Sequence, residues 1–223
     1  MAGEDDGTKR SQRWVVVGVT VTLAVLLGGG AYLFWPRPTD HVLVVGDSVS
    51  YLSIKAIQEA FGSDVRVEPV TRPGYRAGDL LPLARQALDR REAAGEDLDR
   101  AVYLVGYNDV WHGDVETPDL ARLVDESARY DCAIWLTFPA RPAGRHPGAV
   151  DFDPDKADRY NERITELVGK HKNLHLVTDW ADLVTKGAPG QYLEADGVHP
   201  NDQGAKALAK IMADKIGSDC RFA

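Results

Sequence analysis

The chain has 223 residues, of which 44% are hydrophobic and 27% are charged. This composition lies in the globular range, so disordered and collagen-like chains are excluded, and the length leaves room for one core. Beyond residue 39 there are 22 basic and 31 acidic residues, which gives that part a net charge of −9. Because so acidic a domain repels phosphate backbones, a nucleic-acid partner is not expected, and neutral or cationic partners are favoured.

The N-terminal segment contains twenty consecutive uncharged residues, 15–34, which is about the length that crosses a bilayer of roughly 30 Å. With a tryptophan at each end, residues 14–35 are predicted to form a transmembrane helix. Three basic residues precede this helix and one follows it: Lys9, Arg10, Arg13 and then Arg37. The asymmetry predicts that residues 1–13 form a cytoplasmic tail and that the rest of the chain lies outside the cytoplasm.

A cleaved signal peptide is the alternative interpretation of this segment, since small residues at 28–31 follow an apolar stretch. Both interpretations predict export. Residues 36–40 contain two prolines and form a short linker, which spans only about 15 Å at about 3.1 Å per residue. The folded domain is therefore expected over residues 41–223, close to the membrane.

From residue 41 onward, short apolar runs alternate with longer amphipathic segments, without an internal repeat. The apolar runs predict five strands, at residues 41–45, 65–70, 101–105, 132–138 and 174–177. The amphipathic patterns predict five helices, at about 49–61, 77–94, 117–130, 154–171 and 201–216. This alternation is typical of an α/β fold, so we expect one doubly wound, flavodoxin-like, five-stranded parallel sheet with flanking helices. In such sheets, ligands bind at the carboxyl ends of the strands.

Two candidate site residues follow the first and second predicted strands. Gly46, Asp47 and Ser48 stand directly before a helix, so Ser48 is presented where the helix dipole and free N–H groups favour negative charge. The local alternative is that Asp47 and Ser48 only cap the helix, which is the common use of these residue types. After the second strand, Gly74 allows a backbone N–H to approach a ligand closely.

The remaining candidates follow the third strand and precede the last helix. Asn108 has an amide that can donate a hydrogen bond to an oxyanion, although Asn-Asp is also common in turns. Asp196 and His199 are three residues apart in one loop, where the carboxylate can orient the imidazole as a base. Each signal is weak alone. Together they predict a nucleophile, a base, its orienting carboxylate and oxyanion donors at one sheet edge.

These blocks resemble the four signature blocks of the SGNH (GDSL-type) hydrolase family. The matching sequences are GDS at 46–48, the glycine at 74, GYND at 106–109 in the G-x-N-D form, and DGVHP at 196–200 in the D-x-x-H-P form. They occur in the family's order and span the predicted domain. Residues 49–52 read VSYL instead of the leucine-rich version, and the region around Gly74 is only loosely similar. The substrate is therefore not predicted by the resemblance.

The resemblance implies a role for each candidate residue. Ser48 would be the nucleophile, His199 the general base and then acid, and Asp196 the residue that orients His199. The backbone N–H groups of Ser48 and Gly74 and the side chain of Asn108 would form the oxyanion hole. The implied function is a membrane-anchored, extracytoplasmic serine esterase acting on carboxylic O-acyl esters, with acyl groups of envelope glycans or lipids as candidate substrates. The alternatives are an O-acyltransferase that uses the same acyl-enzyme and a catalytically silent glycan-binding module.

No cofactor or metal is expected, because the chain has neither a phosphate-binding glycine loop with lysine nor a histidine spacing typical of metal ligands. A partial calcium-loop pattern lacks the required glycine, whose position is taken by Lys156; its acidic positions are Asp151, Asp153, Asp155 and Glu162. The sequence Asp153-Pro154 instead predicts the capped start of a helix.

Three further features have open interpretations. Cys132 and Cys220 either form one disulfide, which export would allow, or remain free thiols. The loop at 139–152 contains three basic residues, which either face an anionic substrate group or are solvated: Arg141, Arg145 and His146. Trp111 and His112, just after the Asn108 block, are candidates for lining the site.

Overall fold

The computed structural model describes residues 40–113, 115–142 and 152–220. The chain divides into two compact units, Met1–Arg37 and Pro38–Ala223, and the described residues all belong to the second. The predicted cytoplasmic tail and transmembrane helix, and the linker up to residue 39, lie outside the described residues. Within the described ranges, no helix combines the length and the hydropathy of a bilayer span.

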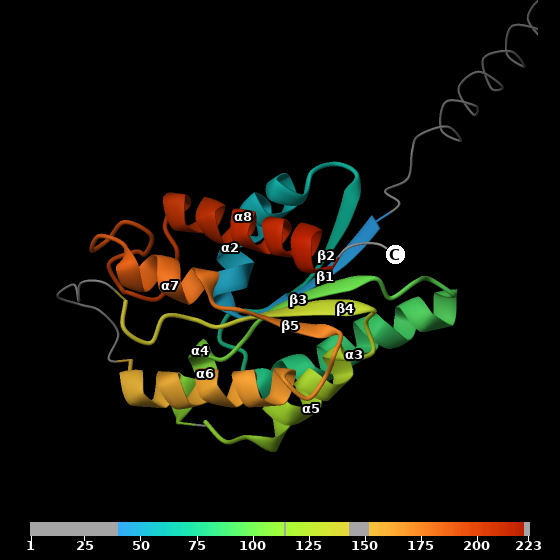
Figure 1. Cartoon of the computed structure of the whole chain (residues 1–223), viewed down its shortest axis with the longest axis horizontal. Helices are drawn as coiled ribbons and strands as arrows, with labels where there is room; N and C mark the ends of the chain where they lie inside the picture. Colours follow the sequence, from blue (N-terminus) through green and yellow to red (C-terminus); the bar gives the residue numbers. More distant parts are fainter. Residues whose placement is uncertain (1–39, 114, 143–151, 221–223) are drawn as a thin grey trace, which may run out of the picture. The chain divides into compact units, whose positions relative to one another are not determined.

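The core of the domain is a five-stranded parallel sheet with the strand order β2-β1-β3-β4-β5 (Figure 1). The strands are β1 (Asp40–Gly46), β2 (Val65–Thr71), β3 (Arg100–Leu104), β4 (Cys132–Leu136) and β5 (Leu174–Val177). This is the flavodoxin-like order, so the predicted doubly wound sheet is confirmed. The strand order reverses between β1 and β3, and this switch point is where such sheets bind ligands.

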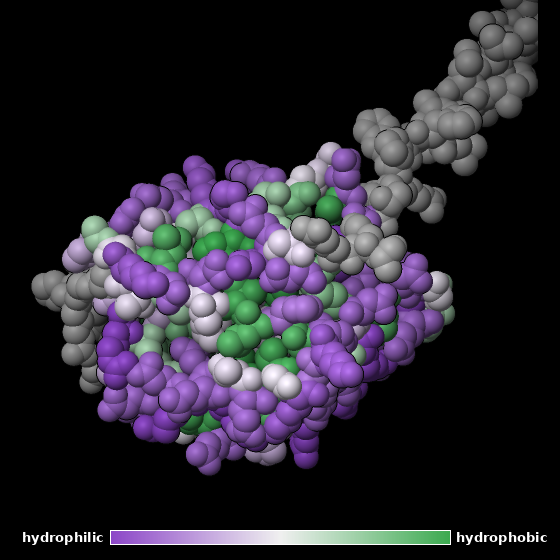
Figure 2. All heavy atoms as spheres, viewed as in Figure 1, coloured by the Kyte–Doolittle hydropathy of each residue, from purple (hydrophilic) through white to green (hydrophobic). Residues whose placement is uncertain are grey.

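Helices cover both faces of the sheet. In Figure 1, α2 (Ser48–Phe61) and α8 (Asp202–Asp219) lie on one side, and α3 (Ala77–Ala94), α5 (Pro118–Ser127) and α6 (Pro154–Val168) lie on the other. Two shorter helices, α4 (Tyr107–His112) and α7 (Asp179–Lys186), contact α6 and α8 respectively. Figure 2 shows hydrophobic atoms along the middle of the visible face, between the hydrophilic surfaces of the two helical layers.

The inner strands are almost wholly apolar because both of their faces are covered. In β1, Val42, Leu43, Val44 and Val45 have no exposed surface. Tyr103 of β3 lies opposite Trp135 of β4, and their stacked rings have centroids 4.6 Å apart. The Trp135 indole N–H donates to Ser127 Oγ at 2.9 Å, so this buried polar group is satisfied from α5. Offset aromatic stacking and the satisfied indole together fix the packing of α5 on the sheet.

The five predicted strands and five predicted helices are confirmed. Most of their predicted boundaries differ from the observed ones by one to three residues. The structure adds α4 and α7, for which the sequence predicts no helix, and it places the block at 106–109 at the start of α4 instead of in a turn. Asn108 lies in the first turn of α4. The predicted capped start of α6 is confirmed, since the Asp153 carboxylate accepts from the N–H groups of Asp155 and Lys156. Asp151 of the calcium pattern lies outside the described residues.

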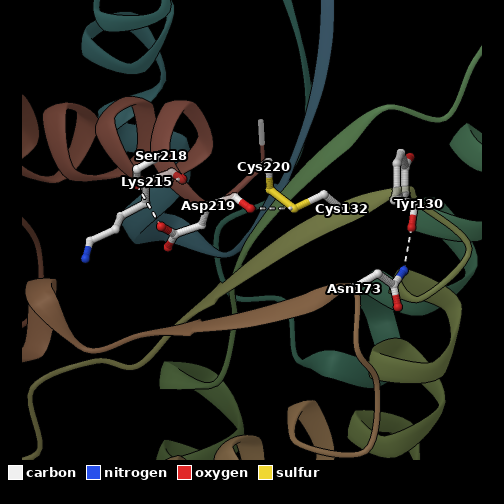
Figure 3. The surroundings of a disulfide bond; sticks show 7 residues. All are labelled: Tyr130, Cys132, Asn173, Lys215, Ser218, Asp219 and Cys220. Atoms are coloured by element: carbon white, nitrogen blue, oxygen red, sulfur yellow. Dashed lines mark hydrogen bonds between the residues drawn. A yellow bond between two sulfur atoms is a disulfide. The ribbon is translucent and has the colours of Figure 1, made fainter. Parts of the chain in front are cut away.

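A disulfide joins Cys132, at the start of β4, to Cys220, at the end of α8 (Figure 3). The Cα atoms are 5.5 Å apart and the two residues are separated by 88 positions. Of the two alternatives, the bridge is therefore the one found. Beside it, the Asn173 side chain donates to the Tyr130 carbonyl at 2.6 Å, which ties the segment before β5 to the segment before β4. This corner of the sheet is thus held by covalent and hydrogen bonds.

Candidate active site

The candidate residues gather at the carboxyl edge of the sheet, around the switch point. Ser48 begins α2 directly after β1, and Asn108 lies in α4 directly after β3, the neighbouring strand. Gly74 follows β2, on the other side of β1. Because the strands are parallel, their carboxyl ends meet at one edge, and the three loops are brought together there.

Ser48 is placed by a tight strand-to-helix turn. Asp47 caps α2, since its carboxylate accepts from the Val49 N–H at 3.1 Å, as the capping interpretation predicted. Gly46 packs so closely that a Cβ there would lie 2.2 Å from Ser50 Oγ and 2.8 Å from the Leu104 carbonyl oxygen. Only glycine fits this position without displacing β3. The turn leaves Ser48 partly exposed at the N-terminus of α2.

A chain of hydrogen bonds joins the serine, the histidine and the aspartate. Ser48 Oγ lies 2.9 Å from His199 Nε2, and His199 Nδ1 lies 2.6 Å from Asp196 Oδ2. The other carboxylate oxygen, Oδ1, accepts from the N–H groups of Val198 at 2.9 Å and His199 at 3.0 Å. With a proton on Nδ1 facing the carboxylate, Nε2 is left to accept the serine proton.

The Asp196 carboxylate is held in its ionised form. Its partial burial acts to raise the pKa of Asp196, but the hydrogen bond from the His199 imidazole and those from the N–H groups of Val198 and His199 outweigh it. The net effect lowers the pKa of Asp196 below its ordinary value. An ionised carboxylate is the state that orients an imidazole and stabilises the imidazolium when it forms.

The loop that carries Asp196 and His199 is anchored at both ends. Leu193 and Pro200 form an isolated antiparallel bridge across its base. Asn201 caps α8 by accepting from the Gly204 N–H at 2.9 Å, and its amide donates to the Gly190 carbonyl at 3.1 Å. Thus His199 is presented from a closed loop that leads directly into α8.

The candidate oxyanion donors lie on segments that are bonded to each other. Asn108 Nδ2 donates to the Tyr75 carbonyl at 3.1 Å. The Asp109 carboxylate accepts the Ala77 N–H, with distances of 3.2 and 3.1 Å to its two oxygens. Gly74 lies in the same turn with φ +79°, a conformation that favours glycine. The structure therefore brings the Asn108 helix to the turn that contains Gly74.

Two aspartates near these segments, Asp47 and Asp109, are buried. The sequence predicts helix capping for Asp47 and no role for Asp109. Asp47 is fully buried, and burial, with the nearby Asp109 carboxylate, raises its pKa to about 7 despite the Val49 N–H. Asp109 is also buried and fixes the start of α3 through Ala77. The capping position was the signal for Asp47, whereas no pattern marks Asp109 as the link between α3 and α4.

Of the two interpretations of the basic loop, contact with an anionic substrate group gains no support from Arg141. Its guanidinium forms ion pairs with Asp155, at 2.8 Å, and with Asp158. Arg145 and His146 lie outside the described residues.

In the part of the chain that the structure describes, no three His, Cys, Asp or Glu side chains form a group that could hold a metal ion.

Comparisons with known proteins place these residues in a family. Residues 44–207 match the model of the GDSL-like lipase/acylhydrolase family. A search of curated proteins found no match. Among solved structures, the chain is similar to the lipase/acylhydrolase from Enterococcus faecalis, with 18% identity and a TM-score of 0.62, over 83% of this chain and 100% of that one.

Two further structures share the fold. The carbohydrate acetylesterase Est24 from Sinorhizobium meliloti is 15% identical with a TM-score of 0.61, over 81% of this chain and 99% of that one. The psychrotrophic esterase EstA from Pseudoalteromonas is 19% identical with a TM-score of 0.55, over 79% of this chain and 96% of that one. At these identities the likeness establishes the fold, and the family match covers most of the chain. The chain therefore belongs to the GDSL-like lipase/acylhydrolase (SGNH) family of ester-hydrolysing serine hydrolases.

Proposed function

We propose that this chain is a membrane-anchored, extracytoplasmic serine esterase that hydrolyses carboxylic O-acyl esters through Ser48, His199 and Asp196. The observation that carries the proposal is the continuous path of hydrogen bonds from Asp196 through His199 to Ser48. A binding module without catalysis has no need of a carboxylate that orients an imidazole toward a serine hydroxyl. The family supports ester hydrolysis as the reaction class.

In the first half of the reaction, His199 Nε2 takes the Ser48 hydroxyl proton while Oγ attacks the ester carbonyl carbon. The carbonyl oxygen becomes an oxyanion, which we assign to the N–H groups of Ser48 and Gly74 and the Asn108 amide. The tetrahedral intermediate collapses as the imidazolium returns the proton to the leaving alkoxide. The products of this half are the alcohol and an acyl ester of Ser48.

In the second half, water replaces the alcohol. His199 takes a proton from water, the hydroxide attacks the acyl carbonyl carbon, and a second oxyanion forms in the same place. Its collapse breaks the bond to Oγ, and the proton on His199 returns to the serine. Asp196 remains ionised throughout and holds the imidazole in one orientation. The lowered pKa of Asp196 supports this role.

Export and membrane anchoring form the second part of the proposal. The uncharged stretch at 15–34, with its basic residues mainly on the N-terminal side, supports a signal anchor. The Cys132–Cys220 disulfide supports an oxidising compartment for the folded domain, since disulfides are rare in reducing cytosol. Resistance of the full chain to alkaline extraction from membranes tests the anchor. Release into the soluble fraction would contradict it.

The catalytic proposal is tested with p-nitrophenyl acetate and butyrate as substrates for the full chain. Turnover is expected in the wild type and not in Ser48→Ala at equal folded concentration. An ethylphosphonate ester should add covalently to Ser48 in the wild type, with the adduct located by mass spectrometry. Equal turnover in Ser48→Ala, or an adduct on another residue, would refute the assignment of the nucleophile.

A further inference from the structure

Large hydrophobic side chains are exposed at only a few places in the described part of the chain. They are Tyr51, Leu52, Tyr75 and Trp111, with exposed fractions of 46%, 57%, 37% and 52%. The core residues of the sheet, by contrast, have almost no exposed surface. Single exposed apolar residues are ordinary, but several gathered around one site usually mark a binding surface.

Each of these side chains is adjacent to a proposed reacting group. Tyr51 and Leu52 follow Ser48 in α2 by three and four residues, the spacing at which side chains on a helix are neighbours. Trp111 follows Asn108 in α4 by three residues.

The fourth member is in the turn after β2. Tyr75 directly follows Gly74, and its carbonyl accepts the Asn108 amide at 3.1 Å. The strands that precede the three segments are adjacent in the order β2-β1-β3. The four residues therefore border the nucleophile and the oxyanion donors.

None of the four comes from the loop that carries Asp196 and His199. This matters because His199 protonates the leaving alkoxide, so the alcohol part of the ester lies on the imidazole side of the tetrahedral carbon. The acyl substituent extends away from the imidazole. The segments that carry Ser48, Gly74 and Asn108 are the ones that bear the exposed apolar side chains.

We infer that Tyr51, Leu52, Tyr75 and Trp111, the acyl surface, bind the hydrocarbon chain of the ester and make medium-length acyl esters better substrates than acetyl esters. The inference rests on the proposed esterase function and adds its substrate class. Contact between the acyl chain of the ester and the acyl surface removes apolar area of both from water. A fully buried methylene gains about fourfold in binding, and one that contacts an open surface on one side gains about twofold.

The test compares kcat/KM for p-nitrophenyl octanoate with that for p-nitrophenyl acetate, using the full chain without free detergent. The ratio within one variant does not depend on the folded fraction. Six added methylenes predict a wild-type ratio on the order of 60. Leu52→Ala and Trp111→Ala should each lower the ratio by about three- to tenfold. Glu59→Ala, two turns beyond Tyr51 in α2 and 63% exposed in its side chain, is the matched control and should retain the wild-type ratio.

The outcomes separate this inference from the proposed function. A wild-type ratio near one, or equal ratios in the wild type and both acyl-surface variants, overturns the acyl surface while leaving the esterase intact. Absence of hydrolysis of either ester overturns the esterase. In that case the acyl surface is decided by binding of sodium octanoate, with sodium acetate as the short probe, to the Ser48→Ala chain.

The binding readout is tryptophan fluorescence. Among the tryptophans of the described residues, Trp135 and Trp180 are buried, whereas Trp111 is exposed on the acyl surface. Trp14 and Trp35 are common to both variants compared, so a response that Trp111→Phe removes is assigned to Trp111. Octanoate should change the emission at concentrations at least tenfold below those of acetate, and Trp111→Phe should abolish the change. Equal responses to octanoate and acetate, or no response to either, would overturn the inference.

Discussion

Removing the Cys132–Cys220 disulfide is expected to destabilise the domain without slowing its chemistry. The bridge closes a loop of 88 residues, for which the chain-entropy relation gives about 4.6 kcal/mol at 25 °C, near the upper end of the range for native disulfides. The loop that carries Asp196 and His199 lies at the other end of α8, whose 18 residues extend about 27 Å. Replacing both cysteines with alanine should therefore lower the free energy of unfolding and leave kcat unchanged at low temperature.

Urea unfolding followed by circular dichroism measures the first quantity, and ester hydrolysis without urea measures the second. With a slope of about 2 kcal/mol per molar urea, the unfolding midpoint should fall by about 2 M. Ser218→Ala, an exposed change on the last turn of α8, is the control and should leave the midpoint in place. An unchanged urea midpoint in the double variant would refute the entropic argument. A fall in kcat while the double variant is folded would refute the claim that the disulfide is too far from the candidate active site to affect the reaction.

Three other substitutions give separate tests. Asp196→Asn should lower kcat by about 10⁴, because the amide stabilises the wrong histidine tautomer; retention of wild-type kcat would show that the aspartate is not needed. Asn108→Ala should lower kcat by about 10² to 10³ with little change in thermal midpoint, and an unchanged kcat would exclude it from the oxyanion hole. Burial raises the pKa of Asp47 to about 7, so the folded chain keeps a proton that the unfolded chain releases above about pH 4. The free energy of unfolding should therefore fall between about pH 4 and pH 7. Asp47→Asn, which keeps an oxygen to cap Val49, should remove Asp47's contribution to that fall, and a urea-midpoint profile identical to that of the wild type would contradict this account.

The sheet could be predicted because its strands are buried on both faces and stand out as short apolar runs. The helices with repeated apolar positions were found for the same reason. The helix α4 was missed because its six residues are too few to show a period, and its start depends on Gly106 at φ +134°. The helix α7 did have a signal: Trp180 and Val184 are four residues apart and both are buried. Eight residues between a strand and a glycine-containing loop nevertheless resemble a connection.

The candidate site was anticipated in part because its polar residues follow strand ends, where a parallel sheet brings them together. The structure joins Ser48, His199 and Asp196 by hydrogen bonds, and it joins Asn108 to the turn after β2. The buried position of Asp109 could not be anticipated, since an aspartate in a predicted loop is normally solvated. Its contact with Ala77 depends on how α3 and α4 meet, which is a property of tertiary packing.

The distance along the chain between Ser48 and His199 has a consequence for when the enzyme becomes active. The two residues are 151 positions apart and meet only when α8 has packed beside α2. A nascent chain carries Ser48 long before it carries His199, so the proposed pair of nucleophile and base is incomplete until synthesis is nearly finished. Hydrolysis by this pair therefore requires the long-range packing of α8 against α2, so a chain in which that contact is open should be inactive even where β1 and α2 are formed.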